Sequence, residues 1–285
     1  MCPLGTTWGW YMSCPRFLLV STSILTACVL VLSAGSWAQS HSSEQVQVKP
    51  PLLRIVDPPS PDASVADLET RADQLRAQKL YLDSLDYYQA ALNKQPNSAK
   101  LLNKIGISEL QMQRYREAKK SFERSIKADK NFADAHNNLG VVCYEERKYA
   151  AAIKHYNKAI EIDENSSSFY SNLGAAYFSK RDFDHAASAY QHALQLDPDV
   201  FERSSRGGVQ AQLPSPEDRA HYDYTVAKLY AKMGFSDRSL EYLKKAMEEG
   251  YKDFKNVYKD SEFVELRKDK RFTELVATRT PALPD

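Results

Sequence analysis

The sequence predicts an all-α fold, an α-α superhelix that forms a right-handed solenoid of helix pairs and ends in a C-terminal helical cap. The first observation is a repeat, because residues 133–166 and 167–200 carry the same pattern of two amphipathic helices joined by a short polar turn. A fixed period of this length indicates helical units that stack on one another. The second observation is composition: 10 Gly and 17 Tyr suit helices that pack through aromatic rings.

The same pattern extends toward the N-terminus, so residues 65–200 contain four copies, the others being residues 65–98 and 99–132. In each copy, small residues stand where two helices must cross, and aromatic residues stand about one turn away. Glycine or alanine at a crossing lets two helices approach to roughly 8–10 Å. The recurring residues include Tyr88, Ala91 and Pro96; Gly106, Ala118 and Phe122; Gly140, Ala152, Tyr156 and Ala159; and Gly174, Ala186, Tyr190, Ala193 and Pro198.

These residues resemble the tetratricopeptide repeat, which has small residues at its eighth, twentieth and twenty-seventh positions and a proline at its thirty-second. The resemblance covers residues 65–200 and implies a superhelix of helix pairs. Local departures are Lys130 and Glu164 in place of the proline, Ser84 and Ser125 in place of alanine, and Arg71-Ala72 in place of Leu-Gly. A divergent first copy is expected, since a terminal repeat exposes one face to water.

The period breaks after the fourth copy. Residues 201–219 are predicted to form a loop because they contain two adjacent glycines and two prolines. Residues 220–251 resemble a fifth tetratricopeptide-like repeat, and residues 252–285 are predicted to form a C-terminal helical cap and tail. This closing segment is similar to the end of some bacterial tetratricopeptide proteins. We expect the fifth copy to stack on the fourth, because its first helix is too apolar to be left in water.

The N-terminus is predicted to be an export signal. Residues 1–38 have the three-part layout of a secretory signal, with Arg16 before an uncharged apolar run and small residues at the cleavage site. Two alternatives stay open, a lipid attached to Cys28 and an uncleaved anchor. All three place the rest of the chain outside the cytoplasm, in the periplasm or medium or held at a membrane. Either Met1 or Met12 is the start of the chain.

Residues 39–64 form a proline-rich linker, whose five prolines exclude a continuous helix. We expect a flexible or extended tether in which the apolar run of residues 52–56 is able to dock elsewhere.

Composition and motifs exclude several classes of function. The 38 basic and 37 acidic residues nearly cancel, which argues against a nucleic-acid-binding protein. No phosphate-binding loop, paired-histidine zinc motif or nucleophile elbow is present in the sequence, so we predict no catalytic residue, no metal site and no cofactor. The lone Cys143 of the repeats is expected to be a small buried residue.

The resemblance implies a binding groove lined by the first helix of each pair. Asn138 and Asn172 match an asparagine that in some members bonds the backbone of a bound peptide. The alternative, that they hold adjacent helices together, is equally open. The predicted groove residues are Asn103, Asn137, Asn138, Val141, Tyr144, Ser171, Asn172, Phe178, Tyr224 and Lys228.

The sequence therefore favours an exported, non-enzymatic scaffold that binds a peptide or a protein partner, with no nucleic acid. We expect a membrane contact only through the signal or through a lipid on Cys28. The alternatives are an envelope assembly or oligomerisation element, or an accessory subunit of a larger enzyme complex.

Overall fold

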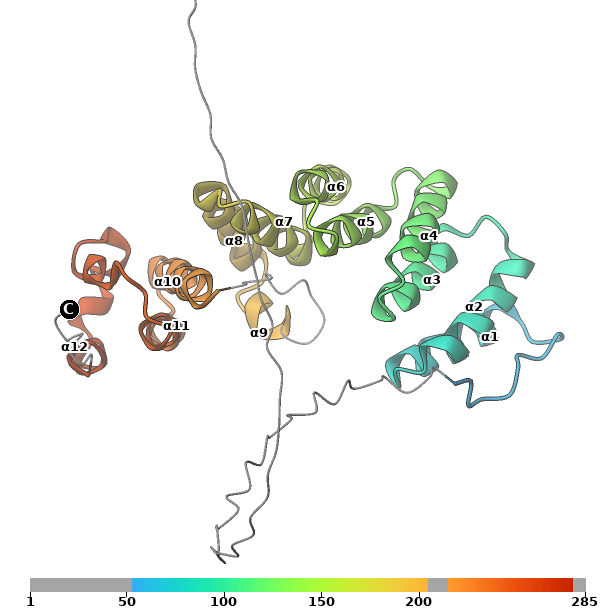
Figure 1. Ribbon diagram of the computed structural model, residues 1–285, viewed down its shortest axis with the longest axis horizontal. Helices are drawn as coiled ribbons and strands as arrows, with labels where there is room; N and C mark the ends of the chain where they lie inside the picture. Colours follow the sequence, from blue (N-terminus) through green and yellow to red (C-terminus); the bar gives the residue numbers. More distant parts are fainter. Residues whose placement is uncertain (1–52, 205–214, 279–285) are drawn as a thin grey trace, which may run out of the picture. The chain divides into compact units, whose positions relative to one another are not determined.

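The computed structural model describes residues 53–204 and 215–278, in which the regular elements are helices, with no strand among these residues (Figure 1). Four helix pairs come first: α1 (Val65–Ala77) with α2 (Tyr81–Lys94), α3 (Ala99–Gln111) with α4 (Tyr115–Ala128), α5 (Ala133–Glu145) with α6 (Tyr149–Ile162), and α7 (Ser167–Ser179) with α8 (Phe183–Leu196). After the short α9 (Val200–Ser204) comes a fifth pair, α10 (Pro216–Lys232) and α11 (Ser236–Glu248).

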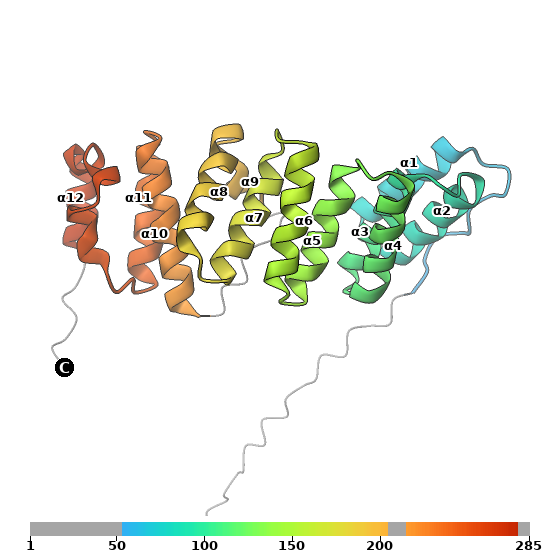
Figure 2. The same cartoon turned by 90° about the horizontal axis from the view of Figure 1, so that it is seen from above.

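Consecutive helices pack side by side in chain order, which confirms the predicted solenoid of helix pairs (Figure 2). The first helices of the four copies begin at Val65, Ala99, Ala133 and Ser167, the residues that open the predicted repeats. Local chemistry fixes some of these starts. Ser64 and Ser98 each accept a hydrogen bond from a backbone N–H of the first turn, which satisfies a donor that the helix itself cannot. Pro216 begins α10, where the missing N–H is no loss.

A left-handed residue stands between the two helices of every pair. Lys79, Gln113, Arg147 and Arg181 have φ between 59° and 63°, and Gly234 holds the same place in the fifth pair with φ of 81°. One residue in this conformation ends the first helix and sends the chain back antiparallel to it. Only the fifth copy uses glycine there, so the turn carries no sequence signal in the other four.

In the second, third and fourth pairs, the two helices cross where a glycine meets an aromatic ring. A Cβ atom added to Gly106 would lie 2.5 Å from the ring of Phe122, and one added to Gly140 would lie 2.6 Å from the ring of Tyr156. Gly174 has the same relation to Tyr190, at 2.5 Å. No side chain fits between them, so glycine sets how closely the two helices approach.

Three serines replace the small alanine of the repeat without leaving an unpaired hydroxyl. Ser84, Ser125 and Ser239 are fully buried. Their hydroxyl groups donate to backbone carbonyls: Ser84 to Tyr81 at 2.8 Å, Ser125 to Ala99 at 2.7 Å and Ser239 to Ala227 at 2.8 Å. A buried hydroxyl that has a partner is tolerated, so these departures from alanine keep the crossing intact.

The fifth pair stacks on the fourth, as the apolar surface of the two predicts. Ala186, Tyr190 and Ala193 of α8 form one core with Val226, Leu229 and Tyr230 of α10. The break between them is not wholly a loop, because its first residues form α9. Phe201 of α9 is buried, and its ring lies edge-on to Tyr190 and Tyr230. The prediction of a loop from residue 201 is therefore wrong for residues 201–204, since Phe201 is needed to fill the space between the two pairs.

The C-terminal segment covers the last pair. It consists of three short 3₁₀ helices, η1 (Phe254–Tyr258), η2 (Ser261–Phe263) and η3 (Leu266–Lys268), followed by α12 (Lys270–Ala277). Its buried side chains belong to the same core as α10 and α11; they are Phe254, Val257, Phe263, Leu266 and Phe272. The predicted cap is therefore present, although much of it is 3₁₀ rather than α-helical.

Part of the proline-rich linker is held against the first pair. Residues 53–61 bond to side chains of α2, so this stretch is extended but is not a free tether. The predicted signal of residues 1–38 lies outside the described residues. In the part of the chain that the structure describes, no helix is both long and apolar enough to cross a membrane.

The aromatic ring at the helix crossing differs between copies in whether it carries a hydroxyl group and whether that group is hydrogen-bonded. The hydroxyl group of Tyr156 is buried without a hydrogen-bond partner among the described residues, whereas that of Tyr88, at the same place in the first copy, bonds to Asp73 and Arg76. Phe122 fills this place in the second copy. We expect Tyr156→Phe to raise the free energy of unfolding by about 1 kcal/mol and Tyr88→Phe to lower it by a similar amount.

Urea denaturation followed by circular dichroism measures both variants. The prediction is contradicted if the two substitutions shift the unfolding midpoint in the same direction.

Candidate functional site

The first helices of neighbouring pairs are joined by a row of polar side chains, which we call the polar ladder: Glu69, Asn103, Lys104, Asn137, Asn138 and Asn172. They occupy the fifth and sixth positions of successive copies. Lys104 bonds to Glu69 at 2.6 Å, Asn138 donates to Asn103 at 2.9 Å and Asn172 donates to Asn137 at 2.8 Å. Asn137 also donates to Asn138 at 3.2 Å, which links two rungs. The ladder therefore ties α3 to α1, α5 to α3 and α7 to α5.

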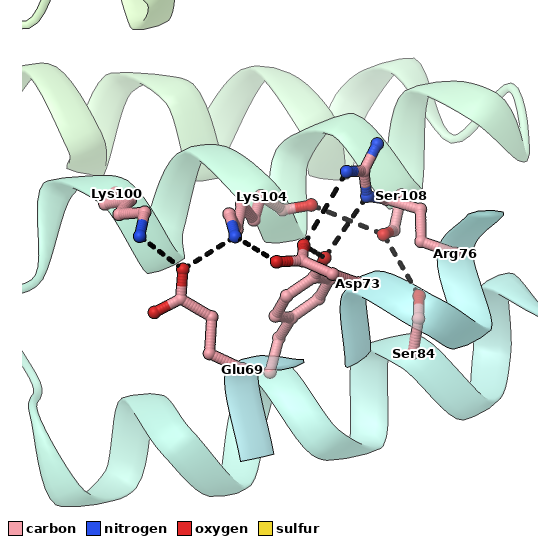
Figure 3. A network of polar contacts seen from close by, with 8 residues as sticks. Glu69, Asp73, Arg76, Ser84, Lys100, Lys104 and Ser108 are labelled. Carbon is pink, nitrogen blue, oxygen red and sulfur yellow. Dashed lines mark hydrogen bonds and ion pairs between the residues drawn. The ribbon is translucent and has the colours of Figure 1, made fainter. Parts of the chain in front are cut away.

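The ladder begins with charged groups (Figure 3). Lys104 lies between the carboxylates of Glu69 and Asp73, and Lys100 adds a second contact to Glu69 at 2.6 Å. Asp73 also accepts a hydrogen bond from Tyr88. Partial burial opposes the charged form of both carboxylates, but the hydrogen bonds from the lysines and from Tyr88 outweigh it and lower the pKa of Glu69 and of Asp73. This end of the ladder is therefore ionised at neutral pH.

A second polar group lies on the first helix of the fifth pair. The hydroxyl of Tyr224 donates to Asp260 at 2.9 Å, and Lys228 lies 3.2 Å from both Asp260 and Glu262. The ring of Tyr224 stacks on Tyr251 with 4.3 Å between centroids. These contacts hold the C-terminal segment against α10.

Most of the predicted groove residues lie in the interior. Those that are buried are Asn103, Asn137, Tyr144, Ser171, Asn172, Phe178 and Tyr224. Tyr144 shares a hydrogen bond of 2.8 Å with Ser179, and Phe178 meets Phe183 and Tyr222 edge-on. The half-buried members are Asn138, Val141 and Lys228, so these three are the predicted residues with exposed surface for a partner.

Asn138 and Asn172 were expected either to bond the backbone of a bound peptide or to hold adjacent helices together. In the structure Asn138 and Asn172 both bond to the preceding first helix, which is the arrangement in which they hold helices together. The acidic partners Glu69, Asp73 and Asp260 were not predicted from the sequence. A signal was present, because Lys104 stands at the asparagine position and opposite charges stand 35 and 31 residues before it.

Metal-ligating residues do not gather here. Within residues 53–204 and 215–278, no three His, Cys, Asp or Glu side chains come together in a way that would hold a metal ion. Cys143 is buried, and burial raises the pKa of its thiol above the usual value.

The ladder makes a testable contribution to stability. Asn137 and Asn172 are both buried, so Asn172→Ala would leave the side-chain oxygen of Asn137 without its donor. We expect a loss of about 1–3 kcal/mol in the free energy of unfolding. The matched control is Asn157→Ala, since Asn157 is exposed on α6 and its loss should change stability by less than about 0.5 kcal/mol. Equal unfolding midpoints in urea for the two variants would show that the ladder is not structural.

Asp223 on α10 gives a pH-dependent prediction. Its half-buried carboxyl group has its pKa raised to about 6, chiefly by burial. In the unfolded chain an aspartate has a pKa near 3.9, so the folded state binds the proton more tightly and loses stability as pH rises from about 4 to about 6. We expect Asp223→Asn to stabilise the chain by about 1 kcal/mol at pH 7, after allowing for solvent screening, and this gain to vanish below about pH 4.

Thermal unfolding of both forms across this pH range checks the prediction, with Asp184→Asn on the exposed side of α8 as control. A gain for Asp223→Asn that does not change with pH would contradict it.

Two sequence models of the tetratricopeptide repeat match the chain, one over residues 103–167 and one over residues 167–200. No curated protein matches the chain.

Among solved structures, the chain is similar to MamA, with 22% identity over 65% of this chain and 96% of that one and a TM-score of 0.44. It is also similar to YrrB, described as a tetratricopeptide protein with an unusual peptide-binding site, with 21% identity over 66% and 87% and a TM-score of 0.44. A third is a thermophilic tetratricopeptide protein of Thermus thermophilus, with 19% identity over 75% and 100% and a TM-score of 0.46. The sequence matches, together with the stacked helix pairs, identify residues 103–200 of this chain as tetratricopeptide repeats.

Proposed function

We propose that this protein is an exported, non-enzymatic scaffold that binds a peptide or protein partner along the first helices α3, α5 and α7. Tetratricopeptide repeats support the proposal, because stacked repeats present the same positions side by side at regular intervals. Such an extended surface suits a partner segment that is itself extended.

The observation that carries the proposal is the state of Asn138. A carboxamide has two N–H groups and an oxygen with two lone pairs. The described contacts of Asn138 use one N–H, donated to Asn103, and one lone pair, which accepts from Asn137. One donor and one acceptor remain on a half-buried side chain, and a peptide backbone offers the matching acceptor and donor. Val141, one turn further along α5, supplies half-buried apolar surface beside it.

The buried members of the predicted groove take a supporting part in this proposal. Tyr144 and Phe178 fill the space beneath the surface, so their removal would damage packing and would not report on binding. A substitution that is meant to report on binding should therefore be made at a residue with exposed surface. The proposed export rests on the sequence of residues 17–38 alone.

The test uses a displayed library of random peptides selected against the purified chain, followed by fluorescence anisotropy of the enriched peptides. We expect Val141→Glu to weaken their binding at least tenfold, because it places a charge in the half-buried apolar surface of α5. The matched control is Ala150→Glu, since Ala150 is exposed on α6, the second helix of the same repeat. Its binding should stay within about twofold of the unchanged chain.

Circular dichroism of each variant separates loss of binding from loss of the fold. The proposal fails if peptides are enriched but bind a folded Val141→Glu chain and the unchanged chain equally well.

A further inference from the structure

A buried carboxylate on α2 holds the backbone of the segment that precedes the first repeat. Asp83 is only 2% exposed. Its Oδ1 accepts the backbone N–H of Ile55 at 2.9 Å and that of Val56 at 3.0 Å. Its Oδ2 is also buried and meets no donor among the described residues. Burying a carboxylate is costly unless it is hydrogen-bonded. The two consecutive N–H groups therefore offset part of the cost of burying Asp83.

The contacts continue along the same face of α2. We call residues 53–61 the strap. Arg54 forms an ion pair with Asp86, Tyr87 donates its hydroxyl to the carbonyl of Asp57 at 3.1 Å, and Lys94 donates to the carbonyl of Pro61 at 2.7 Å. From Asp83 to Lys94 the helix rises about 16 Å, and the six residue-to-residue steps from Ile55 to Pro61 span up to about 20 Å when extended. The strap therefore runs parallel to α2 in a nearly extended form.

The strap is recognised through its backbone and one arginine rather than through apolar side chains. Leu53 and Ile55 remain 69% and 73% exposed. Of the apolar run of residues 52–56 that was expected to dock, Ile55 and Val56 are held through their backbone N–H groups, while the side chains of Leu53 and Ile55 stay exposed. Pro58, Pro59 and Pro61 favour an extended chain whose carbonyl groups are not used in a helix or sheet, and two of the strap carbonyls are bonded by α2.

We propose that Asp83, Asp86, Tyr87 and Lys94 form a second binding site, specific for an extended peptide in which an arginine is followed by two residues with free backbone N–H groups. The strap occupies this site as an intramolecular ligand. The site lies on the second helix of the first pair, away from the ladder of first helices, so it does not depend on the proposed function. A separate peptide of this kind binds once the strap is released.

The strap has an advantage over any separate peptide, because it is tethered next to its site at a high effective concentration. A test must therefore empty the site first. Ile55→Pro combined with Val56→Pro removes both N–H donors from the strap and leaves α2 unchanged. The exposed side chain of Ile55 makes the change at that residue chiefly one of backbone chemistry.

The experiment measures fluorescence anisotropy of a labelled peptide with the sequence of residues 52–62. We expect it to bind the full chain carrying Ile55→Pro and Val56→Pro at least tenfold more tightly than the unchanged chain, whose site is filled. Adding Asp83→Ala should abolish this gain. Leu53→Ala alone, at an exposed side chain, is the matched control and should leave the peptide as weakly bound as in the unchanged chain.

If circular dichroism shows that the Asp83→Ala chain does not fold, Asp86→Ala takes its place in the binding experiment. Added to the two proline substitutions, it should weaken the peptide at least fivefold, but should not affect a peptide in which the position of Arg54 is alanine. The proposal is overturned if the chain with an emptied site binds no better than the unchanged chain. It is equally overturned if a folded Asp83→Ala chain keeps the gain, or if the alanine peptide binds as well as the arginine peptide.

Discussion

The close contact between a glycine backbone and an aromatic ring governs this structure. Phe122 lies against Gly106, Tyr156 against Gly140 and Tyr190 against Gly174, with no room for a Cβ atom. Each contact brings the two helices of a pair together and leaves an apolar surface that only the next pair covers. Stacking therefore follows from the pair, since one pair alone cannot bury that surface. The core that joins α8, α9 and α10 shows the same requirement met across a break in the repeat.

Polar groups then fix how one pair sits on the next. Apolar packing is tolerant of small shifts, whereas a buried amide or carboxylate needs a partner in one place. Asn172 reaches Asn137 and Asn138 reaches Asn103, so the first helices are held in a definite register. Charged groups take over at both ends, around Lys104 and around Lys228. A similar requirement acts on α2, where Oδ1 of buried Asp83 receives its two hydrogen bonds from the strap.

The period of the sequence was enough to predict the fold, because the glycine, alanine and aromatic positions directly encode the helix crossings. The turns were less visible: Arg147 and its equivalents adopt a left-handed conformation that their residue type does not indicate. The groove residues were predicted from their spacing along the first helices, which does not tell how deep each side chain lies. Tyr144 and Phe178 are buried because the neighbouring helix pair covers them, and spacing along one helix does not report that cover. The docking of the strap depends on Asp83, which lies far along the chain from it, and no local pattern marks such a contact.

The most direct test of this account is a double-mutant cycle at one crossing. Gly106→Ala places a methyl group against Phe122, and overpacking of this kind lowers the free energy of unfolding by about 1–3 kcal/mol. Phe122→Leu removes the ring that the methyl group would strike. The account predicts that Gly106→Ala is harmful in the unchanged chain and nearly neutral beside Phe122→Leu, with a coupling of at least about 1 kcal/mol. Strictly additive effects in urea unfolding would contradict it, because they would mean that the glycine and the ring do not set the crossing together.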